Sequence, residues 1–154
     1  MLLNYNHIFP SFTPESRIWI YTSSRELTLE EVKFVSNEMK NFVASWNAHG
    51  KSLNADSVIL YNRFLILTVD EGSHPASGCS IDSSVKTVKF LGEKLKIDFF
   101  DRLKIYIEKD NEFKRIPFFD LKDYPEWNYF NPMIVSLESF RNEWYLPIQD
   151  STLL

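Results

Sequence analysis

The chain is poor in residues that cross-link a fold or anchor it in a membrane. It has a single cysteine among 154 residues, so no disulfide can form within it, and we expect a fold that does not depend on an oxidising compartment. No apolar run approaches the ~20 residues that span a bilayer. The N-terminus has neither the basic nor the apolar region of a secretory signal. We therefore expect a soluble, cytoplasmic protein with no membrane span.

An excess of positive charge is also missing. The chain has 17 Lys and Arg against 21 Asp and Glu, and the net charge of -4 gives no electrostatic reason to expect nucleic acid as a partner. Only 4 glycines and no low-complexity segment occur, whereas 44% of the residues are hydrophobic, which is typical of a globular chain. The length is that of one ordinary domain, so we expect a single α+β domain over residues 1–154.

The phosphate-binding sequence of P-loop nucleotidases is absent as well. Asp70-Glu71 follow an apolar strand, as the Walker B acid does, yet no Gly-x-x-x-x-Gly-Lys-[Ser/Thr] occurs anywhere in the chain. The chain is also too short for an ATP-binding cassette. These two absences disfavour ATP binding.

Short stretches of β-branched and aromatic residues indicate strands. They cover residues 17–23, 57–61, 64–69, 103–108 and 113–116. Asn62-Arg63 and Asp110-Asn111 are the expected hairpin turns, since asparagine tolerates a positive φ. A single long strand over 57–69 is the alternative to the first hairpin, because arginine is a poor partner for asparagine in such a turn.

The first amphipathic helix has a well-marked start. Thr28 is the expected N-cap, and Glu31 completes a capping box. Apolar residues recur at three- and four-residue steps from Val32 to Trp46 and form one face. Gly50 is the expected C-terminal stop, which places His49 in the last turn or just beyond it.

A second amphipathic helix has apolar residues from Ile81 to Leu95 and ends near Lys96. Ser80 or Asp82 is its expected cap. With this helix, the element order becomes strand, helix, strand, strand, helix, strand. That order predicts a ferredoxin-like split βαβ sandwich (βαββαβ) with an extra strand. A C-terminal aromatic extension over residues 118–132 leads to a short helix opened by Ser136, and we expect it to pack as a lid over the sheet.

This topology would bring two distant segments to one end of the sheet. Alternate connections fall at opposite ends, so the turn at residues 46–51 and the loop at residues 70–82 become neighbours. We therefore predict that His49 approaches Cys79. The loop lies between a strand and a helix, where a rigid scaffold often carries a functional site.

The chemistry of that loop leaves three possibilities for Cys79 open. The commonest is a small buried thiol packed beneath the helix. The second is a nucleophile, because a helix start and a nearby charged histidine lower the pKa of a thiol, with His49 or His74 as the base. Asp70, Glu71 and Asp82 oppose a thiolate, since nearby carboxylates disfavour it. The third possibility is a metal ligand.

The loop also resembles a small anion-binding site. Ser77, Gly78 and Ser80 would supply hydroxyl and N–H groups to a phosphate or carboxylate, and Lys51 or Arg63 would supply positive charge. The alternative is that Ser80 only caps its own helix. A metal site could draw on the two histidines, the thiol and Asp70. No zinc-type ligand spacing occurs, so we predict no metal site and name no cofactor.

Four segments carry a resemblance to a known family: Trp46…His49-Gly50, Tyr61-Asn-Arg-Phe64, Val69-Asp-Glu71 and Ser77-Gly-Cys-Ser-Ile-Asp82. Together they resemble a small uncharacterised bacterial family whose members are often labelled "ABC transporter ATPase". The resemblance covers nearly the whole chain, including Glu143-Trp144. It implies ATP binding through that label alone, because the family supplies no established activity.

The sequence is best interpreted as a binding module without enzymatic activity. Residues Asp70 to Asp82 would bind a small ligand, an anion or a protein partner. The alternative is a cysteine-dependent enzyme with Cys79 as nucleophile, His49 or His74 as base, and N–H groups near Ser80 as oxyanion donors. A purely structural loop is the third possibility.

Overall fold

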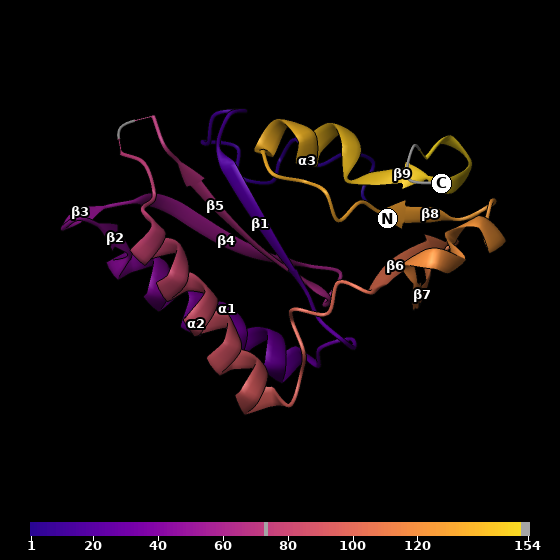
Figure 1. Ribbon diagram of the computed structural model, residues 1–154, viewed down its shortest axis with the longest axis horizontal. Coiled ribbons are helices and arrows are strands. Elements are labelled where there is room, and N and C mark those ends of the chain that lie inside the picture. Colours follow the sequence, from indigo (N-terminus) through magenta and orange to yellow (C-terminus); the bar gives the residue numbers. More distant parts are fainter. Residues whose placement is uncertain (73, 152–154) are drawn as a thin grey trace.

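The computed structural model describes residues 1–72 and 74–151, which form a mixed α+β structure (Figure 1). The elements follow one another as β1 (Arg17–Thr22), α1 (Leu29–Ser45), β2 (Asn47–Ala48), β3 (Lys51–Ser52), β4 (Asn54–Leu60), β5 (Phe64–Asp70), α2 (Gly78–Leu95), β6 (Lys104–Lys109), β7 (Glu112–Pro117), η1 (Phe118–Asp123), β8 (Asn128–Phe130), α3 (Leu137–Glu143), β9 (Tyr145–Pro147) and η2 (Ile148–Asp150). None of the helices in this described part is both long and apolar enough to cross a membrane.

The first sheet has the order β1-β5-β4, and both strand pairs are antiparallel. Its central strand β5 is buried from Phe64 to Val69. Because successive side chains point to opposite faces, Leu65 and Leu67 enter the core on the helical side, whereas Phe64 and Ile66 enter the core on the other side. A fully buried central strand explains why its sequence is continuously apolar rather than alternating.

Helices α1 and α2 lie together on one face of this sheet (Figure 1). The predicted start of α1 is confirmed, because Thr28 and Glu31 form both bonds of the capping box. The predicted end is wrong. The helix stops at Ser45 with Trp46 as its C-cap, and His49 and Gly50 instead turn the β2–β3 hairpin with φ of 53° and 79°. Trp46 has an extended backbone and begins that hairpin. Because Trp46 is still buried, the apolar spacing in the sequence continues past the end of the helix.

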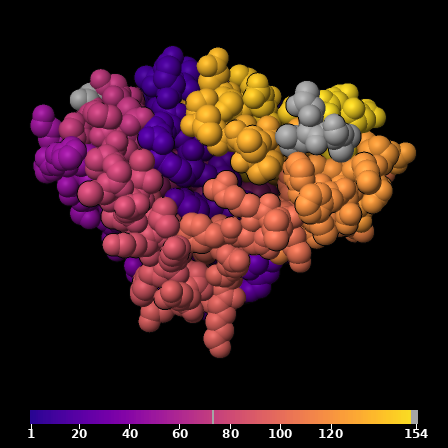
Figure 2. Space-filling model, in the orientation of Figure 1, coloured from indigo at the N-terminus to yellow at the C-terminus, as the bar shows by residue number. Residues whose placement is uncertain are grey.

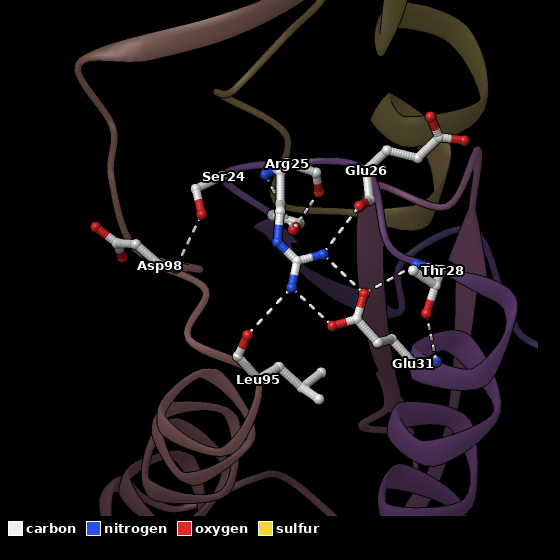
Figure 3. A network of polar contacts seen from close by, with 8 residues as sticks. Ser24, Arg25, Glu26, Thr28, Glu31, Leu95 and Asp98 are labelled. Carbon is white, nitrogen blue, oxygen red and sulfur yellow. Dashed lines mark hydrogen bonds and ion pairs between the residues drawn. The ribbon is translucent and has the colours of Figure 1, made fainter.

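A polar network joins the start of α1 to the end of α2 (Figure 3). The guanidinium of Arg25 donates to both carboxylate oxygens of Glu31 at 2.7 Å and to the carbonyl of Leu95 at 3.1 Å. The Asp98 N–H donates to Ser24 Oγ at 3.0 Å just beyond α2. Arg25 therefore neutralises a carboxylate and satisfies a C-terminal carbonyl of α2, whose end favours positive charge.

The other face of the first sheet is covered by the N-terminal segment, by α3 and by a second sheet of order β7-β6-β8-β9. Aromatic side chains fill this second core. The ring of Trp144 lies 4.9 Å from Phe64 and 4.8 Å from Phe130, measured between centroids, and Phe140 packs beside it. The predicted aromatic lid over residues 118–132 is found only in part: Phe130 lies in this core, whereas Tyr129 lies in a separate core against β6 and Phe119 is exposed. The last helix begins after Ser136 as expected.

The elements β1, α1, β4, β5 and α2 follow the predicted order, whereas β6, which was expected as the fourth strand of the first sheet, lies in the second sheet. In a ferredoxin-like sheet the fourth strand pairs with the first. Here β6 pairs with β7 and β8 in the second sheet, so β5 is the only one of the described strands that β1 pairs with along its length. The shared core of Phe64, Tyr106 and Phe130 holds β6 in this position.

Candidate functional site

Chain connectivity brings the predicted segments together at one end of the first sheet. The register pairs Asn54 with Asp70, so the hairpin that precedes β4 and the loop that follows β5 lie at the same end. Two side chains connect them directly. Trp46 Nε1 donates to the carbonyl of Ser80 at 2.8 Å, and His74 Nε2 lies 2.8 Å from the carbonyl of Ala48.

The acidic pair after β5 holds the loop in shape. Asp70 accepts a hydrogen bond from the Gly72 N–H at 2.9 Å, and Glu71 accepts one from the Ala76 N–H at 2.9 Å. Glu71 also faces Arg17, with 3.7 Å between Oε1 and Nε. These carboxylates, predicted to bind a ligand, are therefore used within the protein. Ser73 belongs to the same loop and lies outside the described residues.

The start of α2 differs from the predicted one. Ser77 is the N-cap, and neither Ser80 nor Asp82 takes that role. The Ser77 hydroxyl accepts from the Ser80 N–H at 3.1 Å, while the Ser80 hydroxyl accepts from the Ser77 N–H at 2.7 Å. This reciprocal box forms because the two serines are spaced as N-cap and N3. The hydroxyls expected to surround an anion are thus already paired with each other's backbone.

Cys79 lies in the first turn of α2 and is exposed. The expectation of a buried, inert thiol is therefore wrong. The apolar face of the helix is formed by Val88 and Leu91, which are fully buried, and Cys79 lies outside that face. Asp82 is likewise exposed and lies outside the depression that Cys79 lines.

Cys79 and His49 both line one open depression of about 360 Å³. We call it the Cys79 depression. Its lining comes from the end of α1, the hairpin and the first turns of α2: Phe42, Ser45, Trp46, Asn47, His49, Ser77, Cys79, Ser80 and Ser83. The predicted meeting of residues 49 and 79 at one end is thus confirmed.

Trp46 is the residue of this site that the sequence interpretation missed. The sequence interpretation places Trp46 only as the last residue of an apolar helix face. In the structure Trp46 is buried and lines the depression, and its ring centroid lies 5.1 Å from that of Phe42. A buried tryptophan usually finds a partner for its N–H. This need for an acceptor could have drawn attention to Trp46 in the sequence, and the Ser80 carbonyl supplies the acceptor.

The two candidate bases differ in how they are held. His74 is half-buried and bound to the hairpin backbone, whereas His49 is exposed in the hairpin turn. Within residues 1–72 and 74–151, no hydrogen bond joins either imidazole to Cys79. The same residues contain no group of three His, Cys, Asp or Glu side chains arranged to hold a metal ion.

Arg63 does not belong to the site, contrary to prediction. It lies in the β4–β5 turn, at the end of the hairpin opposite Asp70. Tyr61 and Asn62 carry the positive φ values of this turn, so the turn is centred one residue earlier than predicted. The Arg63 guanidinium pairs with Glu26 at 3.3 Å and stacks 4.0 Å above the ring of Phe113.

A second concave surface runs along β1, and no sequence pattern predicts it. Figure 2 shows the molecule hollowed between the gold atoms around α3 and the salmon segment that follows α2. The groove has a volume of about 580 Å³. Its lining comes from four separate segments, which is why no local pattern revealed it: Arg17, Ile18, Trp19, Ile20, Tyr21, Val85, Lys89, Phe100, Arg102, Pro132, Met133, Ile134 and Val135.

Comparisons of this chain with protein-family models, with curated proteins and with solved structures find no match.

Proposed function

We propose that this protein is a binding module without enzymatic activity, and that the Cys79 depression is its recognition surface. One observation carries the proposal. Two segments about thirty residues apart in sequence are joined by the Trp46–Ser80 and His74–Ala48 bonds, and they line one open depression that bears an exposed thiol and an exposed imidazole. A preformed concave surface with a few convergent polar groups is the usual form of a binding site.

The polar groups of the loop favour binding over catalysis. Activated nucleophiles have a base within hydrogen-bond reach and a third group that orients the base. His74, which is oriented, is bound to a backbone carbonyl rather than to the thiol. Asp70 and Glu71 accept hydrogen bonds from the loop backbone, and within the described residues neither is bonded to His49.

The expected ligand is a small anion or an anionic group on a partner. The N-terminus of α2 favours negative charge. His49 lies on the rim, and Lys51 pairs with Ala48 in the same hairpin, so a lysine replaces Arg63 as the positive charge at this end. A carboxylate or a phosphate would match these groups.

The cysteine-dependent enzyme is the second candidate, and the shared depression of His49 and Cys79 favours it. Alkylation with iodoacetamide separates the two. The binding module predicts a slow rate that does not change in a His49→Ala variant. A fast rate at neutral pH that falls in His49→Ala would support the enzyme.

Binding itself is tested by adding inorganic phosphate or acetate to isotope-labelled protein and following the NMR spectrum. We expect shifts in the Trp46 indole signal and in the amides of residues 78–80, and we expect a Lys51→Ala variant to weaken them. Shifts confined to the β4–β5 turn, or none at any concentration, would refute the proposal. Adding ATP in the same experiment tests the label "ABC transporter ATPase", which is carried by the family that this chain resembles.

We further propose that β1, α1, β4, β5 and α2 form a ferredoxin-like unit whose fourth strand has joined the second sheet. The sheet order β1-β5-β4 supports this, together with two helices on one face. We also propose the small bacterial family, on the sequence resemblance, and a cytoplasmic location, on a fold that needs no disulfide.

A further inference from the structure

The outer edge of β1 is open over half its length. Consecutive residues of an antiparallel strand direct their N–H and C=O groups to alternate edges. The Ile18 N–H donates outward to the carbonyl of Val135 at 3.1 Å, so Ile20 and Thr22 also face outward. No hydrogen bond within the described part of the chain reaches the outward backbone groups of these two residues. An open strand edge is a template for pairing with another chain.

The edge at Ile20 lies in the groove along β1, where a strand would have walls on both faces, and Thr22 lines a smaller adjoining cavity that shares Ile20, Arg102 and Pro132 with the groove. Val85 on α2 and Phe100 after it form one wall, and Pro132 and Met133 form the other. Met133 and Val135 are 70% and 72% exposed. Large exposed apolar side chains beside unpaired backbone are what an added strand would cover.

The charges that line the groove have one sign. Arg17, Lys89 and Arg102 line it, and none of its described lining residues is acidic, in a chain whose net charge is -4. Arg17 is paired with Glu71 at 3.7 Å, so Lys89 and Arg102 supply most of the positive charge of the groove. Asp101 lines the smaller cavity next to the groove, and its charge is offset there by Arg115 at 3.0 Å. Such a groove favours an acidic occupant.

We infer that the groove along β1 binds an extended, acidic segment of a partner protein, which adds to the sheet as a strand beside Ile20 and Thr22. The backbone bonds would supply affinity, and alternate side chains would meet the apolar walls and the basic rim. A second copy of this chain that docks through the same groove is a poor occupant, because it would bring the same cations against one another. The inference concerns a surface separate from the Cys79 depression and holds even if that depression binds nothing.

The test uses a fluorescein-labelled octapeptide of alternating glutamate and valine and measures its binding by fluorescence anisotropy. We expect saturable binding to one site. An octapeptide of alternating lysine and valine should bind far more weakly, because its charge is wrong for the groove. The glutamate–valine peptide N-methylated on alternate amides should also lose affinity, because it cannot complete the strand ladder.

Charge-reversal variants locate the site. Lys89→Glu and Arg102→Glu should each weaken the octapeptide roughly fivefold, the upper range for an exposed ion pair. Lys86→Glu is the matched control, because Lys86 is exposed on the same helix and does not line the groove. This control should bind within about twofold of the unaltered protein.

Amide hydrogen exchange distinguishes strand pairing from binding by charge alone, because only strand pairing protects the backbone amides of β1. The amides of Ile20 and Thr22 should exchange more slowly when the octapeptide is bound, because they gain acceptors. Binding without this protection would overturn the inference. Equal binding of the lysine–valine peptide, equal competition by a single-stranded DNA oligonucleotide, or self-association of the protein through the same residues would overturn it as well.

Discussion

At the scale of single residues, Cys79 shows how exposure decides the cost of a substitution. Its thiol faces solvent in the first turn of α2, whereas Leu91 on the same helix is fully buried. We predict that Cys79→Ser changes the free energy of unfolding by less than ~0.5 kcal/mol. Leu91→Ala should cost about 2–5 kcal/mol. Urea denaturation measures both, and a cost above ~2 kcal/mol for Cys79→Ser would show that the thiol is part of the core.

Thr28 is a second single-residue test. Its hydroxyl accepts from the Glu31 N–H at 3.1 Å, which satisfies a donor that the helix itself leaves unpaired. Thr28→Ala should therefore lower the free energy of unfolding by about 1 kcal/mol. Thr28→Ser keeps the acceptor and serves as the control. Equal stability of the two variants would mean that the cap contributes nothing.

The same scale shows what local sequence can specify. Thr28 and Glu31 form the capping-box pair that directly precedes the apolar face of α1, and the sequence predicts it correctly. At α2, Ser77, Ser80 and Asp82 are all good capping residues within a few positions. Local preferences do not rank them, and the choice depends on tertiary contacts such as the Trp46–Ser80 bond.

At the scale of elements, the Arg25–Glu31 pair makes the junction of α1 and α2 sensitive to acid. The hydrogen bonds from Arg25 lower the pKa of Glu31 from 4.5 to about 2. A carboxyl whose pKa is depressed in the folded state stabilises the protein above its unfolded pKa, and this contribution is lost as the pH falls through the folded pKa.

We therefore predict that Glu31→Gln flattens the acid dependence of stability. The free energy of unfolding of the unaltered protein should fall more steeply between about pH 4.5 and pH 2 than that of the variant. Glutamine keeps one acceptor oxygen for the Thr28 N–H, so the capping box is preserved, and it removes the charge together with one of the two acceptors for Arg25. Chemical denaturation across this range measures the difference, and identical slopes would contradict it.

The elements also show where periodicity misleads. The apolar spacing continues through Trp46, so it predicts a helix that reaches Gly50. The backbone leaves the helix after Ser45 because the chain enters the hairpin there, and the Trp46 carbonyl accepts from the Leu53 N–H at 3.0 Å. A side-chain pattern reports which residues are buried and not which backbone bonds they make.

At the scale of the whole molecule, a buried carboxylate stabilises the second sheet. Glu108 on β6 is 2% exposed and accepts from the Tyr145 hydroxyl on β9 and from the Asn111 N–H. Burial, followed by the hydrogen bond to Glu108, raises the pKa of Tyr145. We predict that Tyr145→Phe costs about 1–3 kcal/mol, because it leaves a buried acceptor with one donor fewer. Thermal unfolding measures this cost, and an unchanged Tm would show that the Asn111 N–H is sufficient.

The position of β6 is the part of the fold that the sequence could not specify. Its alternating pattern predicts a half-buried strand but carries no information about its neighbour. The neighbour is decided by aromatic contacts among Phe64, Tyr106, Phe130 and Trp144, which come from widely separated parts of the chain. The groove along β1 is open because β6 pairs with β7 and β8 instead of β1. The sequence therefore could not predict the groove, because it could not predict the neighbours of β6.

The most direct test of the composite site uses the single cysteine. A nitroxide spin label attached to Cys79 of the unaltered protein should broaden the NMR signals of the Trp46 indole and of the amides of residues 47–51. It should leave the amides around Arg63, at the opposite end of the β4–β5 hairpin, sharp. Failure of the native thiol to react with the label, or broadening around Arg63 in place of residues 47–51, would contradict the account.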